Sequence, residues 1–233
     1  MTLVFSIISL AVLLLLLSKF ITKYLHLDKA DKVLGKIHCK LGYLLVITAT
    51  IHMLFSFFVF DSRPAYLYIL GVLMLICILM TAISYWCRKS LKKNWLVVHR
   101  IAALIICLLL FSHIGMYFYS VINYQKNVSS IEITEIDVGK IPDGSYIGDC
   151  DVEYIYAKVN VTVKDGKITN IDLMEHRNEK GSAAEKIVDD VIKNQKIDVD
   201  TISGATNSSK VIKKAIENAF AGFVAMPSQS PSL

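Results

Sequence analysis

The sequence predicts a membrane protein in which a four-helix transmembrane bundle is followed by a small α+β domain. The 233 residues are 54% hydrophobic, with a mean hydropathy of +0.51. Residues 1–124 carry 12 Lys and Arg against 3 Asp and Glu, a net charge near +9, whereas residues 125–233 carry 13 against 17, near −4. Because the positive charge lies in loops beside apolar stretches, this pattern argues against nucleic acid as a partner and favours membrane lipid.

Four uncharged stretches, each about 20 residues long and therefore able to cross a bilayer core, predict the membrane helices. They are Met1–Ser18, Leu41–Phe60, Ala65–Cys87 and Ile101–Tyr124. The first stretch has no basic residues before it and no small residues of a cleavage site after it. It is therefore interpreted as a retained span and not as a signal peptide.

The connectors between these stretches predict the orientation of the chain. The first connector holds six Lys and the third holds five Lys and Arg, whereas Arg63 is the single basic residue of the second. Positive charge marks the cytoplasmic side of a membrane protein. We therefore expect the N-terminus and everything after Tyr124 to be extracytoplasmic.

Two pairs of histidines stand on the second and fourth stretches or just before them. His38 and His52 are 14 residues apart, and so are His99 and His113. On a helix, 14 residues return to within about 40° of the same face and rise roughly 21 Å. Because the two helices run in the same direction, we expect His38 to face His99 near the cytoplasmic side and His52 to face His113 deeper. Such pairs suit the axial positions of two b haems, and hydrogen bonding to neighbouring helices is the structural alternative.

This arrangement resembles the haem core of ferric reductases and NADPH oxidases, over roughly residues 35–120. The resemblance implies two haem b groups. That family adds a cytoplasmic FAD and NADPH module, but no G-x-G-x-x-G motif occurs in this chain. We therefore expect the electrons to come from membrane quinol or from a separate dehydrogenase.

The five cysteines form no C-x-x-C or C-x-x-C-H motif. They therefore predict neither a zinc site, an iron–sulfur cluster nor c-type haem. Cys150 alone lies in the second part of the chain, which leaves that part without an internal disulfide.

The second part begins with a linker, residues 125–139, and continues with the α+β domain over residues 140–224. Turn residues and alternating apolar positions predict its strands, and periodic apolar positions predict its helices. The expected elements are a turn into a strand at Ile141–Gly148, strands Ala157–Val163 and Ile168–Met174 joined by an Asp165-Gly166 hairpin, and helices Ser182–Gln195 and Lys210–Phe220. The tail Ala225–Leu233 is expected to be disordered.

The segment Asp200–Ser209 combines a Gly204 turn with a row of hydroxyl side chains, directly before the predicted helix Lys210–Phe220. A turn that leads into a helix N-terminus presents unpaired N–H groups and a positive dipole charge, which favour phosphate. The plain alternative is a Ser- and Thr-rich loop that caps an ordinary helix.

The run Asp-x-x-Ser-Gly-Ala-Thr-x-Ser-Ser in this segment resembles the flavinylation motif of FMN-binding domains. These domains occur in subunits of sodium-pumping quinone reductase and Rnf and in extracellular electron-transfer proteins. The resemblance implies that FMN is joined to Thr206 through a phosphodiester. It places the cofactor beside Asp200, Ser203, Gly204, Ala205, Ser208 and Ser209.

The resemblance extends over about residues 140–220. It includes the opening Asp143-Gly144-x-Tyr146-x-Gly148, the Asp165-Gly166 turn and the stretch His176-x-x-Glu179-x-Gly181. The last of these implies that His176, Glu179 and Gly181 lie beside the isoalloxazine ring. A charged loop at the surface is the plain alternative for this stretch.

Together these features predict transmembrane electron transfer from a cytoplasmic or quinol donor, through two haems, to a covalently bound FMN and an external acceptor. The chain would be an oxidoreductase or electron-transfer subunit similar to ferric reductases, with a flavin transferase as a partner. Asn127, Asn160 and Asn207 stand in Asn-x-Ser/Thr sites, and a glycan on Asn207 would crowd the flavin, which favours a prokaryotic cell membrane. The alternatives are a membrane-anchored FMN redox sensor or a passive subunit of a larger reductase complex, with structural histidines, and a flavin-free binding module.

Overall fold

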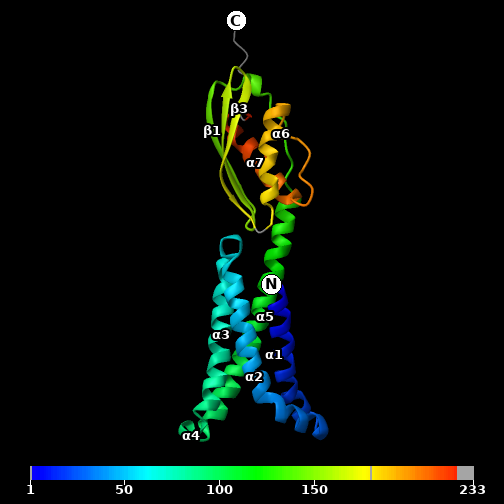
Figure 1. Cartoon of the computed structure of the whole chain (residues 1–233), viewed down its shortest axis with the longest axis vertical. Helices are drawn as coiled ribbons and strands as arrows, with labels where there is room; N and C mark the ends of the chain where they lie inside the picture. The colour runs from blue at the N-terminus through cyan, green and yellow to red at the C-terminus, as the bar shows by residue number, and fades with distance from the viewer. Residues whose placement is uncertain (1, 179, 225–233) are drawn as a thin grey trace. The chain divides into compact units, whose positions relative to one another are not determined.

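The computed structural model describes residues 2–178 and 180–224, which divide into two compact units (Figure 1). Residues 2–60 and 65–118 form the first unit. Residues 61–64 and 119 onward form the second. The tail expected at 225–233 lies outside the described residues.

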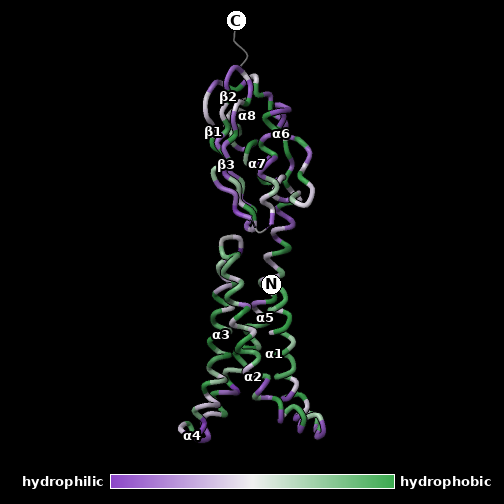
Figure 2. Tube along the Cα trace, in the orientation of Figure 1, coloured by the Kyte–Doolittle hydropathy of each residue, from purple (hydrophilic) through white to green (hydrophobic). Residues whose placement is uncertain are grey.

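Long apolar helices make up the first unit, as Figure 2 shows by hydropathy. They are α1 (Thr2–Tyr24), α2 (Asp28–Phe57), α3 (Ala65–Trp86) and α5 (Asn94–Ser129), with the short helices η1 (Phe60–Ser62) and α4 (Arg88–Leu91) in the connectors. All four long helices have the length and composition needed to cross a membrane. The prediction of four long apolar helices is therefore confirmed, while insertion in a membrane stays a prediction.

The first unit buries few side chains. Its core is a small cluster of Val12, Leu13, Leu45, Ile78 and Ile106. Large apolar side chains elsewhere on the same helices point outward and are exposed. Helices that are apolar on nearly all sides fit a lipid environment, where the outer face needs no polar cover.

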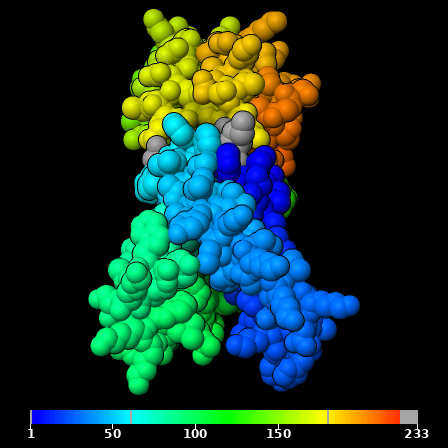
Figure 3. Space-filling view, turned by 60° about the horizontal axis from the view of Figure 1, so that its bottom comes forward, coloured from blue at the N-terminus to red at the C-terminus, as the bar shows by residue number. Residues whose placement is uncertain are grey.

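One end of the first unit carries most of its basic side chains. At this end, the α1–α2 turn and α4 form two separate tips, as Figures 1 and 3 show. Exposed Lys23, Lys29 and Lys32 lie at the first of these, and Arg88 and Lys89 at the second. Both basic connectors are thus at the same end of the helices, as the predicted topology requires.

α5 passes from the first unit into the second. It continues to Ser129, five residues into the segment expected to be a linker. Residues 116–129 contain neither Gly nor Pro, so nothing in the sequence interrupts the helix there. Its last part, from Tyr119, belongs to the second unit.

The second unit contains a three-stranded antiparallel sheet in the order β1-β2-β3. Its strands are β1 (Gly144–Asp151), β2 (Tyr156–Lys164) and β3 (Lys167–Arg177). In β2 alternate side chains, from Ala157 to Val163, are buried, which is the period-2 pattern of a sheet with one covered face. Asp165 and Gly166 have φ of 52° and 69°, as a two-residue hairpin requires. The predicted α+β domain with this hairpin is confirmed.

Helices cover one face of the sheet. They are η3 (Ser182–Lys186), α6 (Ile187–Asn194), α7 (Thr206–Ala219) and α8 (Ala221–Val224), and η2 (Val138–Lys140) precedes β1. The single helix expected at 182–195 is thus a 3₁₀ turn followed by an α-helix. α7 buries Val211, Ile212 and Ile216 completely. It can approach β1 closely because Gly148 has no side chain: a β-carbon there would clash with the carbonyl oxygen of Ala215 and the amide nitrogen of Ala219.

A buried lysine fixes the loop that leads into α7. The Lys213 side chain is 6% exposed, and its Nζ donates to Asp198 Oδ1 and to the carbonyl oxygen of Val199, both at 2.7 Å. Farther along, Ser209 Oγ accepts a hydrogen bond from the amide of Ile202 at 3.1 Å. The loop is therefore held to α7 at two points, and the start of that helix has a defined position.

Candidate functional site

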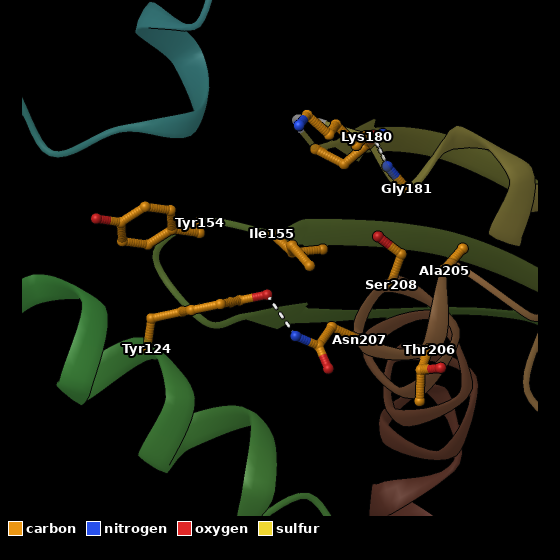
Figure 4. A pocket seen from close by; sticks show the side chains of 11 residues that line it. Tyr124, Tyr154, Ile155, Lys180, Gly181, Ala205, Thr206, Asn207 and Ser208 are labelled. Carbon is orange, nitrogen blue, oxygen red and sulfur yellow. Dashed lines mark hydrogen bonds between the residues drawn. The ribbon is translucent and has the colours of Figure 1, made fainter. Parts of the chain in front are cut away.

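The second unit has a cavity of about 450 Å³ at the start of α7 (Figure 4). Residues from four places in the chain form its walls: the end of α5, the β1–β2 turn, the loop after β3, and the first turn of α7 with the two residues before it. They are Tyr124, Tyr154, Ile155, Asn178, Lys180, Gly181, Gly204, Ala205, Thr206, Asn207 and Ser208. The cavity is large enough for part of a cofactor or drug-sized ligand.

The start of α7 supplies one wall of the cavity and has no side-chain cap. The cap position is Ala205, with φ −133°, and no side chain of the described residues caps the first turn there. The first backbone bond of the helix runs from the amide of Ser209 to the carbonyl of Ala205 at 2.9 Å. The amides of Thr206, Asn207 and Ser208 come before it and lack a partner inside the helix. A hydroxyl-capped helix, the plain alternative for this segment, is therefore not what the chain forms.

The predicted attachment residue, Thr206, is exposed and lines the cavity. Gly204, Ala205 and Ser208 line it as well. The φ of Gly204 is +77°, a conformation that costs other residues about 1–2 kcal/mol. Glycine is therefore favoured at this turn.

The other residues of the motif lie outside the cavity. Asp200 and Ser203 are exposed but do not line it. Ser209 is completely buried, and its hydroxyl holds the amide of Ile202. Its position points to a role in the shape of the loop.

The loop after β3 forms the opposite wall. Asn178 organises this loop, because its Oδ1 accepts a bond from the amide of Gly181 at 2.7 Å and its Nδ2 donates to the carbonyl of His176 at 3.4 Å. Gly181 lies directly against Ser208, and a β-carbon on Gly181 would clash with the Ser208 hydroxyl. The two walls therefore touch at a glycine.

His176 lies beneath this loop and does not line the cavity. Its side chain is 3% exposed, and Nδ1 lies 3.0 Å from Glu185 Oε1. Nε2 is buried and has no hydrogen-bond partner among the described residues. Glu179, the other charged residue of the predicted stretch, lies outside the described residues.

Several cavity residues could not be found from the sequence. Three of them stand at positions where the two motifs allow any residue: Asn178, Lys180 and Asn207. The motifs therefore selected only the residues beside them. Tyr124 was assigned to the end of a membrane helix, and Tyr154 lies in a turn that no motif marks. Only the fold brings these two tyrosines to the cavity.

In the first unit, the structure brings one of the predicted histidine pairs into contact. The rings of His38 and His99 have centres 6.1 Å apart and planes inclined at 60°. Among the described residues, no comparable ring contact joins His52 to His113. His113 lies beside Gly71 of α3, where an added β-carbon would be 3.9 Å from its Cε1.

Backbone carbonyls orient two of these imidazoles. His99 Nδ1 lies 3.4 Å from the carbonyl oxygen of Thr81, and His52 Nδ1 lies 3.2 Å from that of Thr2. A carbonyl oxygen can only accept, so Nδ1 carries the proton, and in the neutral imidazole Nε2 keeps a free lone pair. Metal-bound histidines commonly have this arrangement. In the described part of the chain, no group of three or more His, Cys, Asp or Glu could hold a metal ion. This finding does not bear on a bis-histidine haem, because such a haem takes only two ligands from the protein.

Comparison with known protein families identifies the second unit. Residues 155–221 match the model of the FMN-binding domain, and this range includes Thr206 and the loop after β3. No curated protein and no solved structure matches the chain. The second unit therefore contains a match to an FMN-binding domain, which supports FMN as its ligand, and it follows four long apolar helices.

Proposed function

We propose that this chain is a transmembrane electron-transfer protein of a prokaryotic cell membrane, with FMN attached through a phosphodiester to Thr206 and two b haems held by the histidine pairs. Quinol or a dehydrogenase supplies electrons on the cytoplasmic side, and an external acceptor receives them. The observation that carries this proposal is the position of Thr206. It is exposed at the first residue of α7, on a cavity within an FMN-binding domain.

The cavity suits the phosphate of the cofactor on one side. The uncapped amides of α7 provide hydrogen-bond donors and positive dipole charge beside Thr206, and Lys180 adds a positive charge on the opposite wall of the cavity. Bound flavin supplies the redox chemistry, while the protein positions and shields it. A flavin transferase would form the bond, and the covalent tether would keep the flavin on a domain outside the cell.

The geometry of His38 and His99 supports the first haem. The ring centres of His38 and His99 are 6.1 Å apart, so these two imidazoles would be close enough to serve as the two protein ligands of one haem. Bound haem supplies a one-electron carrier whose potential depends on its axial ligands. For the second haem, the support is the hydrogen bond from His52 Nδ1 to the Thr2 carbonyl, because it leaves Nε2 of His52 for binding to a metal.

The proposed direction rests on the basic connectors. Both lie at one end of the apolar helices, and positive charge favours the cytoplasmic side. The second unit follows the last of these helices and would therefore be extracytoplasmic.

The attachment of FMN can be tested on protein purified from membranes of a host that has a flavin transferase. We expect an intact mass that includes FMN and a fluorescent band on a denaturing gel. Thr206→Ala should lose both, whereas Thr201→Ala, in the same loop but outside the cavity, should keep them. A fluorescent band in Thr206→Ala would refute the assignment of Thr206. A wild-type chain without flavin would favour a flavin-free binding module.

A second function, a membrane-anchored redox sensor or a passive subunit of a larger reductase complex, is favoured by the contacts of His52 and His99 with backbone carbonyl oxygens of neighbouring helices. Its histidines would be structural. The two functions differ in the effect of His113→Ala. A conduit should lose reduction of the flavin by electrons from the cytoplasmic side, whereas an anchored sensor should keep it.

A further inference from the structure

We propose that Tyr124 and Tyr154 form an aromatic wall for the isoalloxazine ring and that Tyr124, through Asn207, positions the first turn of α7 beside the attachment residue. This inference rests on the proposed attachment of FMN to Thr206. It makes the end of α5 part of the flavin site, although the family match begins only at residue 155.

The two tyrosines are paired with each other and line the same cavity. Their ring centres are 4.9 Å apart with planes inclined at 40°, a spacing at which aromatic rings attract each other. Tyr124 comes from α5 and Tyr154 from the turn between β1 and β2 (Figure 4). Ile155 continues this apolar wall.

Hydrogen bonds hold both rings at their hydroxyl ends. Asn207 Nδ2 donates to the Tyr124 hydroxyl at 2.9 Å. The Tyr154 hydroxyl lies 2.6 Å from Ser120 Oγ, and Ser120 is completely buried. Because Asn207 is the residue after Thr206, a displacement of Tyr124 would be transmitted directly to the attachment turn.

The cavity is therefore polar on one side and aromatic on the other. The α7 amides match an anionic phosphate, whereas Tyr124 and Ile155 match a flat apolar ring. Tyr154 supports the Tyr124 ring from behind and has the Arg63 guanidinium 4.6 Å from its own ring centre. FMN has these two ends. The distribution of polar and apolar groups thus predicts how the cofactor is oriented, with its phosphate at Thr206 and its ring toward the tyrosines.

The fluorescence of the attached flavin tests this wall, because a tyrosine in contact with a photo-excited flavin donates an electron to it and takes it back without emission of light. We would compare the full-length wild type with Tyr124→Leu and Tyr124→Phe, at equal flavin content measured by intact mass. Both substitutions remove the electron-rich phenol, so the fluorescence per flavin should rise. Tyr156→Leu is the matched control, since Tyr156 belongs to the same domain but does not line the cavity.

Fluorescence per flavin that is the same in Tyr124→Phe as in the wild type would overturn the inference. Tyr124→Phe decides alone if Tyr124→Leu is too unstable to isolate, because it keeps the ring and its packing. A rise with Tyr156→Leu equal to that with Tyr124→Phe would also overturn it. A wild-type chain without covalent flavin would instead refute the proposed attachment, and the mass measurement separates that outcome from the others.

Discussion

The imidazole rings of His38 and His99, on α2 and α5, lie with their centres 6.1 Å apart and their planes at 60°. The two residues are 61 positions apart in the chain, so only the packing of the two helices brings them together. Nδ1 of His99 lies 3.4 Å from the carbonyl oxygen of Thr81, which leaves Nε2 as the nitrogen that could bind a metal. This relationship carries the prediction for the haem.

We predict that His99→Ala reduces the haem content of the purified chain by about half, since one of two bis-histidine pairs loses a ligand. Haem per protein is measured from the reduced b-type absorption spectrum against the protein concentration. His26→Asn is the control, because His26 is an exposed connector residue with φ of 53°, a conformation that Asn tolerates. Full haem content in His99→Ala would show that this histidine is not an axial ligand.

The contact between Gly181 and Ser208 predicts a defect with a specific rescue. A methyl group in Gly181→Ala would clash with the Ser208 side chain, so the two walls of the cavity must separate. We expect less flavin per protein by intact mass and a normal haem content. Adding Ser208→Gly removes the group that the methyl meets and should restore the flavin. If Gly181→Ala binds flavin normally, the contact between these walls is not required for attachment.

The sequence predicted the elements of both units because their signals are local. Four uncharged stretches correspond to α1, α2, α3 and α5, and the Asp165-Gly166 pair forms the hairpin between β2 and β3. The end of α5 was placed too early, since polar residues after Tyr124 indicated a linker. A helix continues through polar residues when no Gly or Pro interrupts it and when one of its faces packs, as Val128 does in the core of the second unit.

The sequence predicted only part of the cavity. Thr206, Gly204 and Gly181 belong to motifs, so spacing was enough to select them. Tyr124 and Tyr154 are 30 positions apart, and no local pattern indicates that they meet. For Ser209 and His176 the motifs predicted cavity residues, and the structure places neither of them at the cavity. Both belong to motifs, yet the fold places the first behind the loop and the second beneath it.

Cys150 allows a prediction about pH. Burial raises the pKa of its thiol from 9.0 to about 11, so the thiolate fraction near neutral pH is about a hundredfold smaller than that of an ordinary cysteine. We predict slow alkylation of Cys150 in the folded chain, increasing tenfold per pH unit up to about pH 11, and fast alkylation in denaturant. Peptide mass spectrometry distinguishes Cys150 from the other four cysteines. Equal rates in the two states would mean that the thiol is accessible and unperturbed.

The same shift affects the stability of the second unit. The folded state keeps its thiol proton to a higher pH than the unfolded state, so this contribution to stability is fully present below about pH 9 and is lost as the pH rises toward 11. Cys150→Ser should therefore decrease the loss of stability between these two pH values. The unfolding midpoint in denaturant, measured at both pH values, gives the comparison.

Gly148→Ala should destabilise the second unit because β1 and α7 approach each other through this glycine. The added β-carbon would clash with the carbonyl oxygen of Ala215 and the amide nitrogen of Ala219, and a helix backbone cannot move away as a flexible side chain can. Overpacking of this kind costs about 1–3 kcal/mol, or a shift of several degrees in Tm. Thermal unfolding, followed by the fluorescence of the attached flavin, measures the change.

Gly222→Ala is the matched control for this substitution. It lies in α8 of the same unit, and a β-carbon there meets nothing within 4 Å. Because alanine forms helices better than glycine, the Tm of Gly222→Ala should be equal to that of the wild type or slightly higher. Equal Tm values for Gly148→Ala and Gly222→Ala would mean that α7 can shift away from β1 at no cost. The close contact between strand and helix would then not be what holds the first turn of α7, and with it Thr206, in position.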